Sequence, residues 1–239
     1  MNTRLFLYVL VLTFIIVHAF PAVASAQDFQ GGANFLIGIP QGEFRSTLDN
    51  TGIGLGVDFA YTPTASPFAF GAEFGFLLVG QETREEPFST TIPDVKVDVT
   101  TSNNMVLGNL FVRVQPSSGL LRPYLEALGG FHYLYTDTKI ENQRDGEEVA
   151  SSTNFSDLAW SYGAGGGVMI KVYEPDPDEY SEPQIGELLI DFRLRYRSGG
   201  KAEYLQEGSI RREGGQITYD VSRSKTDLLT VQIGVTIRF

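Results

Sequence analysis

The chain has 239 residues, of which 42% are hydrophobic, and it carries 18 basic and 29 acidic residues for a formal net charge of -11 at pH 7. This acidic balance argues against nucleic acid as a partner. Cysteine is absent, so disulfides are excluded as a source of stability.

The N-terminus predicts a cleaved secretory signal peptide. MNTR supplies a short basic start, LFLYVLVLTFIIVHAF forms an apolar core, and the small residues Ala24 and Ala26 fit a cleavage site. A transmembrane anchor is the alternative, but a histidine and a proline interrupt the run. We therefore expect residues 1–26 to be removed. Residues 27–239 would then form a single domain with 17 basic and 29 acidic residues, a net charge of -12.

Eight stretches of the mature chain alternate apolar and polar residues, the period of two that is typical of strands with one apolar face. The clearest is the closing segment LLTVQIGVTIRF, where every second residue from Leu229 to Phe239 is apolar. In chain order the predicted strands are 29–39, 52–61, 68–79, 105–115, 121–136, 157–173, 187–197 and 227–239.

The connections between these strands alternate in length. Segments 62–67, 116–120 and 174–186 are compact and contain proline or glycine. The others are longer and cover 40–51, 80–104, 137–156 and 198–226. Short turns at one end and long loops at the other are typical of an up-and-down barrel of the outer-membrane type.

Side-chain size indicates which face points inward. The polar face of the eight strands carries twelve glycines and the apolar face four, while bulky residues such as Phe35, Phe74 and Trp160 lie on the apolar face. A closed eight-stranded barrel has room for few large groups inside, so we expect the small-residue face inside and the apolar face against lipid. A soluble barrel with its apolar face inside is the alternative, and recovery from the periplasm without detergent would support it.

With these features the chain resembles the small outer-membrane β-barrels of the outer membrane protein A, X and W kind. The resemblance covers nearly all of residues 28–239 and includes RPYLEALGGF at the fifth strand and a last strand that ends on Phe239. It implies an all-β, eight-stranded antiparallel up-and-down transmembrane β-barrel with short periplasmic turns and long extracellular loops, located in the outer membrane of a Gram-negative cell. It also implies that the barrel-assembly machinery reads the C-terminal strand, through Val235, Ile237 and Phe239.

Charged residues also fall on the inward face. We predict that a lumen charge network is formed by Asp58, Glu73, Arg113, Glu126, Lys171, Glu187, Asp191, Arg193, Arg195 and Arg238. Charges in a narrow interior need partners, so five acids and five bases favour a salt-bridge network that plugs the barrel. The sequence pairs Arg113 with Glu126 and Glu187 with Arg238 on neighbouring strands. A selective polar pore is the alternative, which the narrow interior of eight strands disfavours.

The mature chain offers little for catalysis, and no cofactor or metal site is predicted. Its one histidine, His132, is expected to point inward, and no spacing marks a serine beside it. GAGGG at 163–167 precedes a strand, so it is no phosphate loop. The acidic segment EPDPDEYSEP at 174–183 lacks the glycine that a calcium loop usually has. A lipid-modifying enzyme with His132 as base is the second alternative function.

The long loops are the predicted functional surface. Val95, Val97 and Val99 are odd-numbered, whereas the lipid-facing residues after them are even-numbered, so we expect a bulge or break near 102–104 and a strand that continues beyond the bilayer as a ribbon. GQITYDVSRS at 215–224 is interpreted as a similar extension of the last strand. Such ribbons suit contact with surface sugars, matrix or protein, although they could merely shield the barrel mouth.

The sequence therefore predicts a monomeric outer-membrane barrel with a plugged polar lumen, which contacts lipid and acts in envelope structure or in surface interaction. A narrow channel for small or hydrophobic solutes is the first alternative, and conductance in reconstituted bilayers separates the two.

Overall fold

The computed structural model describes residues 29–239 except for 49, 64–65, 90–91, 143–147, 175–185 and 214–215. The expected signal peptide and most of the acidic segment 174–183 therefore lie outside the described residues. Within the described part of the chain, no helix is long and apolar enough to cross a membrane.

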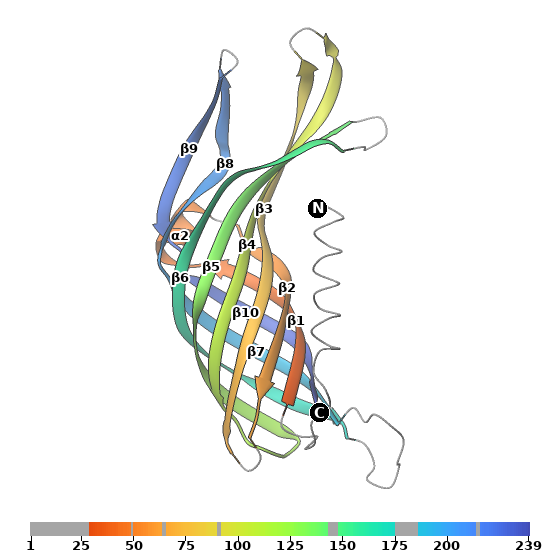
Figure 1. Ribbon diagram of the computed structural model, residues 1–239, viewed down its shortest axis with the longest axis vertical. Coiled ribbons are helices and arrows are strands. Elements are labelled where there is room, and N and C mark those ends of the chain that lie inside the picture. Colours follow the sequence, from red (N-terminus) through yellow and green to blue (C-terminus); the bar gives the residue numbers. More distant parts are fainter. Residues whose placement is uncertain are drawn as a thin grey trace.

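Eight antiparallel strands close into a barrel in the order β1-β10-β7-β6-β5-β4-β3-β2 (Figure 1). Their bounds are β1 Phe29–Pro40, β2 Gly52–Tyr61, β3 Phe68–Ser89, β4 Ile92–Val114, β5 Leu121–Asn142, β6 Glu148–Tyr173, β7 Glu187–Gly199 and β10 Leu228–Arg238. The ring closes because β1 pairs with β2 on one side and with β10 on the other. The predicted eight-stranded up-and-down barrel is confirmed.

The two ends of the barrel differ. The C-terminal ends of β2, β4 and β6, together with Phe29 and Phe239, lie at one end, which we call the short-turn end (Figure 1). At the long-loop end, β3 and β4 continue together to the pair Ser89 and Ile92, and β5 and β6 continue to the pair Glu141 and Glu148. Most of the predicted loops 80–104 and 137–156 are therefore strand, because the ladders continue beyond the closed part of the barrel.

The bulge expected in β4 near 102–104 lies on the neighbouring strand instead. The register of β3 and β4 shifts between Leu78 and Gly80, so that Val79 is the extra residue opposite Asn103 and Asn104. β4 itself pairs with β5 without a shift over its described partners. The predicted position along the barrel axis, level with residues 102–104, was correct. The predicted strand was wrong, because the extra residue belongs to β3 and not to β4.

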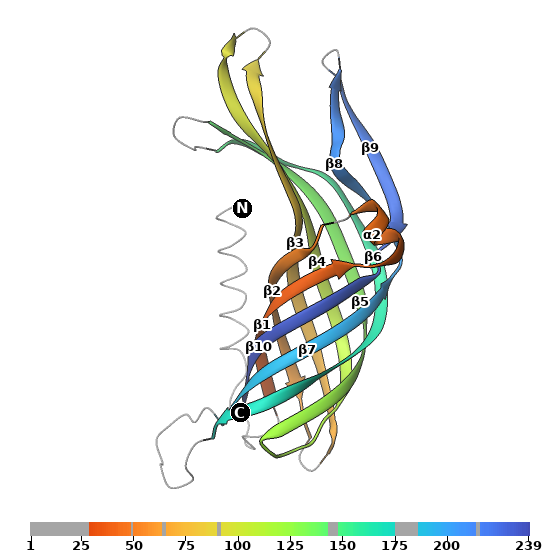
Figure 2. The same ribbon diagram turned by 180° about the vertical axis from the view of Figure 1, so that it is seen from behind.

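The predicted loop 198–226 folds into a separate hairpin of β8 (Lys201–Glu213) and β9 (Gln216–Lys225) (Figure 2). The prediction that 215–224 extends the last strand is therefore wrong, because β9 pairs with β8. The chain turns between β9 and β10 at Asp227, whose Oδ1 accepts the Gly199 amide at 2.9 Å. The loop after β1 contains a short helix, α2 (Gly42–Thr47), which the sequence did not predict.

Side chains alternate between the two faces of the barrel as expected. Leu125 and Trp160 are 73% and 75% exposed on the outer face. Glycines make room on the inner face: a Cβ on Gly167 would lie 2.5 Å from the Tyr124 hydroxyl, and one on Gly32 would lie 2.9 Å from a carboxylate oxygen of a buried aspartate. The glycine-rich face is therefore inside because large polar groups occupy the space that the glycines leave.

Candidate functional site

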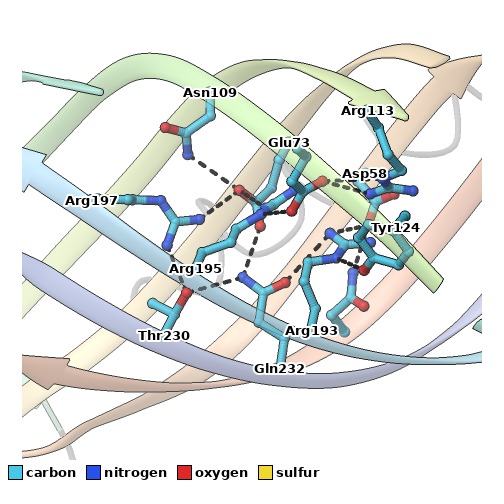
Figure 3. A network of polar contacts seen from close by, with 12 residues as sticks. Asp58, Glu73, Asn109, Arg113, Tyr124, Arg193, Arg195, Arg197, Thr230 and Gln232 are labelled. Carbon is cyan, nitrogen blue, oxygen red and sulfur yellow. Dashed lines mark hydrogen bonds and ion pairs between the residues drawn. The ribbon is translucent and has the colours of Figure 1, made fainter. Parts of the chain in front are cut away.

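The candidate site is a network of charged side chains inside the barrel (Figure 3). No more than 1% of any of these side chains is exposed. We call this set the central network, and its members are Asp58, Glu73, Arg113, Glu126, Asp191, Arg193, Arg195 and Arg197. Four carboxylates face four guanidinium groups, so their formal charges cancel. Burial of such groups is tolerated only when each charge has partners.

Glu126 binds two arginines from different strands. It lies directly opposite Arg113, whose Nε and NH2 donate to its Oε2 at 3.1 and 3.0 Å. Its Oε1 accepts from Arg195 on β7. Gly165 on β6 stands between these two strands in the same row, and a Cβ there would lie 2.6 Å from Arg195 Cγ. The glycine thus allows the arginine to reach across a strand.

Glu73 on β3 connects strands from opposite sides of the lumen (Figure 3). Its Oε2 accepts from Arg197 NH2 at 2.8 Å and from Asn109 Nδ2 at 3.2 Å, and it forms an ion pair with Arg195. Its Oε1 accepts from Gln232 Nε2 at 3.1 Å. Charge-assisted bonds of this kind are among the stronger hydrogen bonds in proteins. A single carboxylate therefore joins β3 to β4, β7 and β10.

Arg193 joins the remaining two carboxylates. It donates to Asp191 and, through NH1, to Asp58 Oδ1 at 3.2 Å. Its Nε donates to the Tyr124 hydroxyl at 2.8 Å, and that hydroxyl donates to Asp191 Oδ1 at 2.7 Å. Asn34 on β1 donates to Asp58 Oδ1 at 2.7 Å. The network thus reaches β1 and β2, so that all parts of the barrel wall except β6 contribute a polar side chain to it.

A second, more exposed cluster lies at the short-turn end. Glu187 accepts from Arg122 NH2 at 2.6 Å, and Lys171 and Arg238 lie at 3.7 and 3.6 Å from its carboxylate. Arg238 also donates to the carbonyl oxygen of Ser117 at 2.6 Å. These contacts tie the turn between β4 and β5 to β7 and β10.

The interior is apolar toward the long-loop end, which the prediction of a polar lumen did not anticipate. Leu36, Leu77 and Leu107 continue the inward rows above the central network and belong to one buried apolar cluster. Phe44 of α2 and Tyr204 of β8 complete this cluster, with ring centroids 5.5 Å apart in an edge-on arrangement. We call Phe44, Tyr204 and their apolar neighbours the mouth cluster. It arises because α2 and the start of β8 lie at the rim of the barrel (Figure 2), from where Phe44 and Tyr204 join the apolar residues of the barrel strands.

His132 lies between the two regions. It is fully buried, and its Nδ1 lies 3.2 Å from the Thr226 hydroxyl, which in turn donates to the Gly200 carbonyl at 3.1 Å. The histidine therefore contacts the segment that connects the hairpin to the barrel. Among the described residues there is no group of three or more His, Asp or Glu side chains that could hold a metal ion.

The structure places all ten residues of the predicted charge network in the interior. Seven of them belong to the central network, while Lys171, Glu187 and Arg238 lie in the cluster at the short-turn end. The prediction omitted Arg197 and Arg122, which are fully or almost fully buried. Each lies two residues from another inward-facing residue on its strand, so the alternation alone could have identified them. Their role in a plug stays a prediction.

A closed antiparallel barrel with an apolar outer face and a charged interior defines an outer-membrane β-barrel protein. The sequence matches the outer membrane protein beta-barrel domain family over residues 8–173, and the chain belongs to this family. Its location is therefore the cell outer membrane, as the sequence predicted. The short-turn end is periplasmic and the long-loop end is extracellular.

Several solved structures are similar to this chain. Neisserial surface protein A is 11% identical, with a TM-score of 0.42 over 90% of this chain and 98% of its own. Ail, the attachment invasion locus protein of Yersinia pestis, is 15% identical, with a TM-score of 0.34 over 89% of this chain and 97% of its own. A major outer membrane protein from Thermus thermophilus is 12% identical, with a TM-score of 0.39 over 90% of this chain and 100% of its own. No curated protein matches the sequence.

Proposed function

We propose that the protein is a non-conducting barrel whose lumen is plugged by its own side chains, and that it acts in envelope structure or in surface interaction through its extracellular strands. The observation that carries this proposal is that two closed layers of side chains follow one another along the lumen. The central network is buried and charge-balanced, and the mouth cluster covers it on the extracellular side. An ion would have to break buried ion pairs and cross an apolar layer to pass.

The surface role is supported by the open edges of the extracellular strands. β2 pairs with β3 only as far as Leu78, and β6 pairs with β7 only from Ser161 onward. Beyond these points β3, β4, β5 and β6 pair with one another in an extracellular sheet, and the outer strands β3 and β6 have no further strand partner among the described pairings. An extended segment of a partner could pair with such an edge.

Reconstitution of residues 27–239 in planar lipid bilayers tests the plug. We expect no protein-dependent current, because both buried layers of the lumen oppose the passage of an ion. Discrete ohmic steps that require the folded protein would overturn the plug and favour the narrow channel.

Loop orientation can be tested in intact cells, since the chain has no cysteine. We expect a membrane-impermeant maleimide to label Ser152→Cys on the extracellular sheet without permeabilisation. Ser118→Cys, in the turn between β4 and β5, should react only after the outer membrane is permeabilised. Both residues are exposed, so they form a matched pair. The reverse pattern would contradict the assignment of the long-loop end to the cell surface.

The protein is proposed to act without enzymatic chemistry. His132, the base that a lipid-modifying activity would use, is fully buried and contacts a threonine. If deletion of the protein alters the lipid A of the host while His132→Ala restores the normal pattern, the histidine is not a base. If a folded His132→Ala protein fails to restore the normal lipid A pattern, the result would favour a lipid-modifying enzyme.

Assembly is proposed to use the last strand. Val235 and Phe239 are 45% and 42% exposed on the lipid-facing side, where the barrel-assembly machinery could read them together with Ile237. We further propose that the folded protein is a monomer in lipid, because one chain completes the ring.

A further inference from the structure

The outer face of the β8–β9 hairpin carries three basic side chains at its base. Lys201 and Lys225 are directly opposite each other in the register, and Arg223 lies opposite Glu203 in the next row on the same face. Lys201, Arg223 and Lys225 are exposed. Directly opposed side chains have Cβ atoms only about 5 Å apart, and like charges in such a pair destabilise a sheet. The arrangement is unfavourable unless a negative group lies nearby.

None of these three bases forms an ion pair with any residue that the structure describes. By contrast, Arg84 pairs with Glu82, Lys139 pairs with Glu141, and the interior bases belong to the two charge clusters. Acidic residues also lie close by. Glu203 is on the same face, a carboxylate oxygen of Glu43 accepts the backbone amide of Lys225 at 3.2 Å, and Asp157 Oδ2 accepts the backbone amide of Glu203 at 2.8 Å. The carboxylates of Glu43 and Asp157 are thus bound to backbone amides, and the three basic side chains keep no ionic partner among the described residues.

The position of these bases relative to the membrane identifies their partner. The amide of Gly200, the residue before Lys201, donates to the carbonyl oxygen of Trp160 at 2.7 Å, and the Trp160 side chain is 75% exposed on the lipid-facing side. Below Lys225, the same outward face continues into the apolar residues Leu229 and Val231 of β10. Exposed tryptophan is enriched at the level where the hydrocarbon ends and the headgroups begin. The base of the hairpin, where β8 starts and β9 ends, lies at the rim of the barrel (Figure 2), so we infer that its basic side chains lie at headgroup level on the extracellular side.

The base of the hairpin is also held in place. Thr226 donates its amide to the Gly200 carbonyl at 3.1 Å, and Asp227 accepts from the Gly199 amide at 2.9 Å and from the Ser198 hydroxyl at 3.2 Å. The backbone next to Lys201 and Lys225 is thus fixed to the rim of the barrel, so that little further backbone entropy is lost when an anion binds.

We propose that Lys201, Arg223 and Lys225 form a binding site for the phosphate groups of outer-leaflet lipid headgroups. The site orients the hairpin on the membrane surface and neutralises the opposed lysines. Ammonium and guanidinium groups both donate to phosphate oxygens, and a basic cluster near an anionic membrane surface attracts its lipids.

Electron spin resonance of spin-labelled lipids tests this site in vesicles of phosphatidylcholine that contain the refolded protein. The measured quantity is the association of spin-labelled phosphatidic acid with the barrel relative to spin-labelled phosphatidylcholine. We expect the wild-type protein to select phosphatidic acid, and Lys201→Gln with Lys225→Gln to lower that selectivity by at least about threefold. The arginine pair K201R/K225R should retain it.

The matched control removes two positive charges elsewhere on the extracellular strands, with Arg84→Gln and Lys139→Gln. It should keep the wild-type selectivity, and heat-modifiable migration in gels confirms that each variant is folded. Unchanged selectivity in the Lys201 and Lys225 double variant would overturn the proposal. An equal loss in the control would overturn it too, because net charge would then explain the effect. Loss of selectivity in about 10 mM inorganic phosphate at constant ionic strength would indicate a site for free phosphate instead, since added phosphate would then compete for the same donors.

Discussion

Individual residues in the lumen show what the alternation of inward and outward side chains along a strand can predict. Alternation assigns Glu126 and Arg195 to the inside correctly, but it says nothing of which charges meet. Arg195 contacts Glu126 across Gly165 and also pairs with Glu73. Such contacts depend on the closure of the ring, because β3 and β7 are brought to opposite sides of one lumen. Uncharged partners such as Gln232 were missed for the same reason.

The first prediction at this scale concerns Glu126. Replacing Glu126 with Gln removes the shared partner of Arg113 and Arg195 while leaving both cations buried. We expect a loss of about 3–5 kcal/mol in the free energy of unfolding, since breaking a buried ion pair leaves an uncompensated charge. Urea titration of the protein in lipid vesicles, followed by tryptophan fluorescence, measures it.

Glu187→Gln is the control for this prediction. It makes the same chemical change in the cluster at the periplasmic end, where the carboxylate side chain is 17% exposed. Water can partly solvate the remaining cations there, so a loss of only about 1 kcal/mol is expected. Equal losses in the two variants would show that burial in the central network does not determine the effect.

At the scale of elements, the extracellular connections contain a short helix and a hairpin that their composition did not indicate. α2 begins at Gly42, which adopts a φ of 57°, a conformation that glycine takes without strain. Its Phe44 then reaches into the barrel mouth and contacts Tyr204. The sequence indicated neither the helix nor this contact, because a six-residue helix has too few turns to show a helical period.

A second prediction tests whether the mouth cluster holds these elements in place. Phe44→Ala deletes a fully buried ring that contacts Tyr204 of β8. We therefore expect the free energy of local opening of α2 and β8 to fall by about 3 kcal/mol, which makes amide exchange there roughly a hundredfold faster. Hydrogen exchange resolved by peptide, with β1 and β10 as internal references, measures it. Phe44→Leu should show a much smaller effect. Equal acceleration in the barrel strands would mean that the ring supports the whole barrel instead of the mouth.

For the whole molecule, closure and lipid contact act together. β1 and β10 complete the ring, and at the periplasmic end the amides and carbonyls of Phe29 and Phe239 bond each other at 3.2 and 3.0 Å. None of the eight described strands of the ring is left with an open edge inside the membrane, where unpaired backbone groups would be costly. The alternating pattern therefore has a stable arrangement only when all eight strands are present.

A third prediction separates assembly in the cell from folding itself. Phe239→Ala should lower the amount of protein in the outer membrane several-fold, while the purified variant refolds in lipid vesicles to nearly the wild-type extent. Phe35→Ala is the control, because Phe35 is 43% exposed and Phe239 is 42% exposed. Quantitative blotting of membrane fractions and gel-shift refolding assays measure the two properties. If both substitutions reduce membrane levels equally, the aromatic residue at 239 is not a specific assembly signal.

The sequence by itself determined the eight strands of the ring and their inward and outward faces, because both follow from a local period of two and from residue size. The outer-membrane location followed from the resemblance to small outer-membrane β-barrels. Only the tertiary structure decided which charges pair, that Val79 carries the bulge, that 198–226 forms its own hairpin and that the lumen is apolar toward the extracellular mouth. These features depend on register and on closure of the ring, which bring together residues far apart in the chain. The opposed pair Lys201 and Lys225 belongs to this second group, since only the hairpin register places the two lysines side by side.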